Sequence, residues 1–116
     1  MRVISQDGTI DVPYDYFSLS VASGKYEDVE VAYIYCHNLS SPNGTKLAEY
    51  STEAKAIKVM EILREQYSRI EIIKALASGT CKHMEESLKP EEFKDILKKY
   101  INMEVFQFPQ DDEIEV

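Results

Sequence analysis

A chain of 116 residues, 44% of them hydrophobic, is long enough for one domain with its own hydrophobic core. Acidic residues outnumber basic ones by 21 to 13, and the resulting charge of -8 disfavours nucleic-acid binding, which needs Lys and Arg at the phosphates. No stretch approaches the roughly 20 apolar residues of a membrane span, and the N-terminus lacks a signal peptide. We therefore expect a cytoplasmic protein whose two cysteines stay reduced.

The first half of the chain has the alternating pattern and turn signals of β-strands. Asp7-Gly8 is typical of a hairpin turn, Pro13 ends the second strand, and Ser23-Gly24-Lys25 predicts the next turn. The fourth strand is apolar on both faces, as in a central strand or one covered on two sides. The expected strands span residues 3–5, 9–12, 17–22, 29–36 and 45–50. Short connections between them predict one antiparallel β-meander of about five strands.

The second half changes to helical periodicity. Apolar residues recur at helical spacing at Ala56, Val59, Met60, Leu63, Tyr67 and Ile70. This helix either continues to Ala77 or breaks near Ser68, and Gly79 suits its C-terminal cap. Pro90 begins another helix, whose expected buried stripe is Phe93, Ile96, Leu97, Tyr100 and Ile101. Residues 80–89 fit either a helix or a connection.

A short strand at 103–108, stopped by Pro109, completes the expected fold. We expect this strand to return to the sheet of the N-terminal hairpin. The fold class is α+β, with a single domain over residues 1–109: a meander, then two to three helices packed on it, then the C-terminal strand. Residues 110–116 are rich in Asp and Glu and predict a flexible acidic tail.

No catalytic motif occurs in the chain, so we expect a protein that is not an enzyme. It has no nucleophile elbow, no glycine-rich phosphate loop and no zinc-protease helix. The only soft metal ligands are Cys36-His37 and Cys81-Lys82-His83, and their spacing does not favour zinc. We expect neither a metal nor a cofactor.

Eight tyrosines and four phenylalanines accompany only three arginines. Aromatic rings beside an arginine would form a pocket in which a base stacks on a ring and a phosphate meets the guanidinium. Core packing is the alternative role of these rings, and Arg69 follows Glu65 at the spacing of a structural helix pair. The candidate ligand-binding residues are Arg2, Arg64, Arg69, Tyr33, Tyr35 and Phe106.

Four stretches of the chain form a recognisable set: Arg2–Gly8, Leu47–Ala56, Met60–Leu63 and Phe106–Pro109. Together they resemble a family of short proteins encoded in phages and prophages of Gram-positive bacteria. The resemblance carries no catalytic or binding residue over, and residues 14–46 and 70–103 lie in what look like the variable regions of the family. The expected fold is also similar to Thoeris anti-defence proteins, which capture cyclic ADP-ribose signals as oligomers.

The resemblance implies a counter-defence protein of the host cytoplasm that sequesters a cyclic nucleotide-type immune signal without catalysis. Ile57 and Ile62 widen the apolar stripe of the first helix, which favours a homo-oligomer, a dimer or higher. One alternative is an acidic inhibitor that binds a host defence nuclease through charge complementarity, as anti-CRISPR proteins do. Another is a structural or regulatory prophage protein. We expect neither nucleic acid nor a membrane as a partner.

Overall fold

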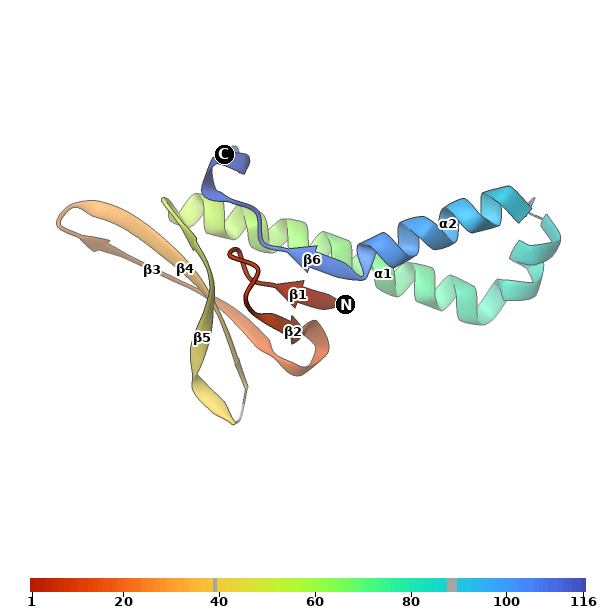
Figure 1. Ribbon diagram of the computed structural model, residues 1–116, viewed down its shortest axis with the longest axis horizontal. Helices are drawn as coiled ribbons and strands as arrows, with labels where there is room; N and C mark the ends of the chain where they lie inside the picture. Colours follow the sequence, from red (N-terminus) through yellow and green to blue (C-terminus); the bar gives the residue numbers. More distant parts are fainter. Residues whose placement is uncertain (39, 88–89) are drawn as a thin grey trace.

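A computed structural model of the protein describes residues 1–38, 40–87 and 90–116, with their side chains except at positions 41, 76–87, 90, 92, 93, 96, 97 and 100. Residues 88 and 89, at the end of the ambiguous segment 80–89, lie outside the described residues. The molecule is elongated, with extents of 62 × 34 × 21 Å. Two small sheets gather around the first half of a long helix, and the second half of that helix extends away from them as an arm (Figure 1).

The first sheet joins the two ends of the chain. Strand β1 (Arg2–Ile4) lies in the middle, antiparallel to β2 (Asp11–Pro13) and parallel to the C-terminal strand β6 (Val105–Gln107). The expected N-terminal hairpin and the return of the C-terminal strand to it are confirmed. The connection from β1 to β2 is longer than a two-residue turn, and Gly8 takes its positive φ of 78° within it.

The second sheet has the order β3 (Ser18–Tyr26), β4 (Val29–Asn38), β5 (Ser41–Tyr50), with antiparallel neighbours. The prediction of a single five-stranded meander is therefore wrong: six strands form two separate sheets. Pro13 has no N–H to donate, and the 3-10 turn η1 (Tyr14–Tyr16) redirects the chain before β3. Strand β6 occupies the remaining edge of β1.

The turn expected at Ser23-Gly24-Lys25 is also misplaced. Strand β3 continues through these residues, and the chain reverses at Glu27-Asp28, which have positive φ values of 51° and 65°. Two consecutive residues with positive φ form the primed turn that matches the twist of a hairpin. The β3–β4 hairpin is therefore longer than predicted, with Tyr26 paired to Val29 beside the turn.

Helix α1 spans Glu53–Ser87 without a break at Ser68 and passes through Gly79, so the predicted cap at Gly79 is wrong. Its predicted apolar stripe is confirmed, with Ala56, Val59, Leu63 and Ile70 fully buried. Helix α2 spans Pro90–Met103 and begins at the predicted proline. Ile101 is 64% exposed rather than buried, and the other four residues of its predicted stripe have no described side chain. Among the described helices, none has a stretch long and apolar enough to cross a membrane.

One hydrophobic core lies between the two sheets and the first half of α1. Val3 and Phe108 contribute to it from the chain ends, Ile34 and Tyr50 from the second sheet, and Leu63 from the helix. Each of these five side chains is at most 1% exposed. The described side chains include no buried nitrogen or oxygen without a hydrogen-bond partner.

The acidic C-terminal segment that we expected to be flexible packs on this core. Its 3-10 turn η2 (Asp111–Glu113) is closed by a capping box between Gln110 and Glu113, and Ile114 is buried among the core residues. The Asp111 carboxylate accepts a hydrogen bond from the Ser51 backbone N–H at 2.7 Å. The Lys55 ammonium donates to the same carboxylate at 3.2 Å. The acidic residues therefore interact with the N-terminal end of α1, where negative charge is stabilised.

Candidate functional site

The six predicted ligand-binding residues lie in several different parts of the molecule. Arg2 is on β1, and its guanidinium forms a salt bridge with Asp11 of β2. Arg64 and Arg69 line a shallow depression on α1 together with Glu61 and Glu65. Phe106 is 7% exposed and packs edge-on against Phe108 within the core, so its ring is not open to a ligand.

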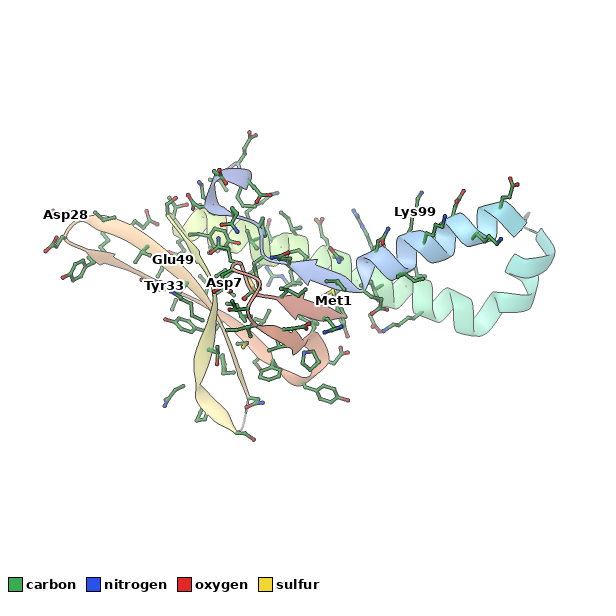
Figure 2. The ribbon with its side chains drawn as sticks, in the orientation of Figure 1. Met1, Asp7, Asp28, Tyr33, Glu49 and Lys99 are labelled. Atoms are coloured by element: carbon green, nitrogen blue, oxygen red, sulfur yellow. The ribbon has the colours of Figure 1, made fainter. Side chains whose placement is uncertain are left out.

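Tyr33 and Tyr35 are the two aromatic residues among the six that lie together. They occupy the same face of β4, and their ring centroids are 6.0 Å apart. The Lys46 ammonium of the neighbouring strand lies 5.4 Å from the centre of the Tyr33 ring, which is a cation–π contact. Figure 2 shows Tyr33 on the side of the sheet away from α1.

These two tyrosines belong to an apolar row that runs along the outer face of the second sheet. Because side chains alternate along a strand, Val29, Val31, Tyr33 and Tyr35 point away from the face that packs on α1. Val29 is 67% exposed and the other three are half-buried. Their neighbours on β3 are the small residues Ser20, Ala22 and Gly24, except that Val29 pairs with Tyr26. We call this row of four β4 residues the outer face.

A groove of about 710 Å³ begins at the outer face and ends at the C-terminal segment. Strand β5 ends at Tyr50, which pairs with Ala32, so the first residues of β4, from Val29 to Val31, have no partner on β5. The floor of the groove is apolar and consists of Tyr26, Val29, Val31 and Tyr33. Four carboxylates surround it: Glu27, Glu30, Glu49 and Asp111. Its lining contains no Lys or Arg, but Lys46 and Lys55 lie next to it and pair with Glu49 and Asp111; we call it the acidic groove.

The carboxylates of the acidic groove differ in how they are held. Glu30 accepts a hydrogen bond from the Glu53 N–H at the start of α1, at 2.9 Å. Asp111 has its pKa lowered, first by the hydrogen bond from the Ser51 N–H and also by Lys55. Glu49 is about half exposed and has Lys46 at 3.8 Å. Glu27 lies in the exposed hairpin turn, so the groove presents negative charge to solvent.

One wall of the acidic groove is fixed by Gln6. Its side-chain amide donates to the backbone oxygens of Glu49 and Pro109, at 3.1 and 3.0 Å. Its amide oxygen accepts from the Glu49 N–H at 3.0 Å. The Tyr50 hydroxyl also donates to Pro109, at 2.7 Å, and burial, with Asp111 and Glu113 nearby, raises the pKa of this phenol. The groove is therefore built on a rigid, neutral network.

The described residues contain no cluster of three or more His, Cys, Asp or Glu side chains that could hold a metal ion. Cys36 is buried on the inner face of β4, and burial raises the pKa of its thiol, which keeps it protonated. His37 lies at the end of the outer face, with its Nε2 3.3 Å from the Ser20 hydroxyl. The side chains of Cys81 and His83 lie outside the described residues.

The sequence pattern indicated that the outer face is apolar, but not that it is exposed. The apolar pattern of residues 29–36 predicted a central strand or one covered on both sides; β4 is central, but its outer face stays open among the described residues. The groove residues Gln6, Glu49 and Asp111 come from three distant parts of the chain, so no local pattern relates them. A signal for Glu49 was its alternation with the apolar Ala48 and Tyr50, which places it on the solvent side of β5.

In comparisons with protein-family models, curated proteins and solved structures, nothing matches this chain.

Proposed function

We propose that the protein is a non-catalytic binding protein whose acidic groove receives a basic, extended segment of another protein. The observation that carries this proposal is the combination of an apolar floor with four surrounding carboxylates and no cation in the lining. An apolar floor contributes affinity by removing surface from water, and the carboxylates select a partner of opposite charge. The same carboxylates repel the phosphates of a nucleotide.

A partner segment with alternating basic and apolar residues would suit the groove. In an extended chain, successive side chains point to opposite sides, so one set would face Tyr26, Val29 and Tyr33 while the other reaches the carboxylates. The partner class that we propose is a host defence nuclease, because a channel for nucleic acid is lined by Lys and Arg. The net charge of -8 would speed the encounter with such a surface.

A defined peptide tests the groove without knowledge of the natural partner. The probe is a ten-residue peptide of alternating Lys and Val, and its binding is measured by calorimetry at low and physiological salt. Changing Glu27→Gln and Glu49→Gln together should weaken binding about tenfold, because two partly exposed ion pairs of about 0.7 kcal/mol each are lost.

The matched control changes two exposed glutamates of α1, Glu61→Gln and Glu65→Gln, which removes the same charge away from the groove. Affinity for the peptide should then change less than twofold. Equal weakening in both double variants would mean that the peptide responds only to the overall charge of the protein, and the groove would not be its site.

Sequestration of a cyclic nucleotide is the second candidate, and the cluster of Tyr33, Tyr35 and Lys46 favours it. A base could stack on a tyrosine ring while the ammonium meets a phosphate. Calorimetry with cyclic ADP-ribose tests this proposal directly. Binding that is lost in Tyr33→Ala but kept in Tyr16→Ala would support it, and the absence of heat with the wild-type protein would reject it for this ligand.

A further inference from the structure

The two edges of the second sheet differ in how they are protected. Along β5, Pro42 removes a backbone donor and two register shifts interrupt the pairing with β4. Gln6 then occupies part of its outer edge, where the Gln6 N–H donates to the Leu47 oxygen at 2.8 Å and its side chain bonds both backbone groups of Glu49. Prolines, bulges and covering segments are the features that keep a strand edge from pairing with another chain.

Strand β3 has none of these protective features. It pairs with β4 over nine consecutive residues without a register shift, from Ser18 to Tyr26. It contains no proline, and its only charged residue is Lys25. All nine residues are exposed or half-buried, and no other described strand pairs with its second edge. A long, regular edge of this kind, with a single charged residue near one end, is a template for pairing with another strand.

We propose that β3 pairs with β3 of a second copy of this chain, antiparallel about a two-fold axis, to form a continuous six-stranded sheet. The edge itself adds little to the repulsion between two copies. Two copies that each carry -8 repel one another over most of their surface, but β3 contains no carboxylate. An antiparallel arrangement also places the two Lys25 side chains at opposite ends of the interface, so they do not meet.

Two exposed tyrosines support the antiparallel register. Tyr16, just before β3, is 77% exposed, and Tyr26, its last residue, is 75% exposed. Pairing centred on Val21 places Tyr26 of one copy opposite Tyr16 of the other, at both ends of the interface. A depression of about 730 Å³ lies beside Tyr16, lined also by Phe17, His37 and Pro42, and it has room for the phenol ring of the second copy.

The mass of the protein in solution tests the proposal. Sedimentation equilibrium between 1 and 100 µM should give a two-chain mass for the wild-type protein. Tyr26→Ala removes two symmetric aromatic contacts and should raise the dissociation constant about tenfold, whereas Tyr26→Phe keeps the ring and should change it little. A wild-type protein that is monomeric at 100 µM would overturn the proposal.

A second variant tests the strand edge itself. In a hairpin whose turn is flanked by the Tyr26–Val29 pair, the Ser23 N–H points to the free edge of β3. Ser23→Pro removes that donor and should abolish the dimer, while Ser23→Thr retains it and should preserve the dimer. If a Ser23→Pro protein with wild-type circular dichroism remains a dimer, another surface mediates association. If that variant does not fold, Tyr16→Glu tests the proposal in its place, because it puts a carboxylate opposite the outer end of the partner strand. A raised dissociation constant would support the proposal, and an unchanged one would contradict it.

Discussion

The two sheets of this protein differ in what their polar groups do. Around β1, β2 and β6, side chains from both chain ends bond to one another: Ser5 and Thr9 donate to Asp7, and Gln110 donates to the Gln6 backbone oxygen at 2.9 Å. We call residues 1–13 and 104–114 the terminal scaffold. The β3–β4 hairpin has few such bonds and leaves apolar side chains exposed, with Asp28 at its far tip (Figure 2).

This contrast separates residues that hold the fold from residues available to a partner. Arg2–Gly8 and Phe106–Pro109 lie in the terminal scaffold, whereas the outer face belongs to the hairpin. A buried and fully bonded network constrains its residue types strongly, whereas an exposed strand face tolerates change. Binding specificity is therefore expected to reside in β3 and β4.

The largest expected effect of this contrast is on stability. Phe108→Ala removes a ring that is 1% exposed and should lower the free energy of unfolding by about 3–5 kcal/mol. Val29→Ala, at a side chain that is 67% exposed, should change it by no more than about 0.5 kcal/mol. Urea denaturation followed by circular dichroism measures both values. Comparable losses would mean that the hairpin is as integral to the core as the terminal scaffold.

A smaller effect is expected at Gln6, which connects the terminal scaffold to β5. Gln6→Ala removes three hydrogen bonds, two to the Glu49 backbone and one to the Pro109 oxygen, which keeps only the Tyr50 hydroxyl as donor, and should cost about 1–3 kcal/mol. Gln6→Glu keeps the acceptor but loses the donor, so it should be at least as destabilising. The same urea titration measures these variants. If both are as stable as the wild type, the Gln6 side chain does not contribute to holding the two sheets together.

The sequence predicted local features of this fold better than their assembly. The helix stripe from Ala56 to Ile70 and the N-terminal hairpin follow from periodicity and turn residues, and both are present. The division into two sheets depends on where β3 pairs after Pro13, a long-range choice that no local pattern encodes. The acidic groove likewise needs Gln6, Glu49 and Asp111 to meet across the whole chain. Tyr33 and Tyr35 lie together on β4, whereas Arg2, Arg64 and Arg69 lie in other parts of the molecule.

The smallest expected effect is a change in acid sensitivity at Asp7. Hydrogen bonds from the Ser5 hydroxyl, then from the Thr9 hydroxyl and N–H, lower the pKa of its carboxyl from 3.8 to about 2. The folded state therefore favours the carboxylate, and this stabilisation is present above about pH 4 and is lost as the pH falls towards 2. Asp7→Asn keeps an acceptor oxygen but forms only the weaker neutral hydrogen bonds.

The Tm of Asp7→Asn should accordingly be below that of the wild type at pH 7, and the difference should shrink between pH 4 and pH 2, as measured by thermal melts across this range. Other carboxylates, Asp111 among them, contribute to acid unfolding in both proteins, so only the difference between the two reports on Asp7. Asp28→Asn, at the exposed hairpin turn, should leave the acid dependence unchanged. If the difference in Tm between Asp7→Asn and the wild type is the same at every pH, the substitution acts through the geometry of the loop and not through the charge of Asp7. The ionised carboxylate would then not contribute to the stability of the terminal scaffold.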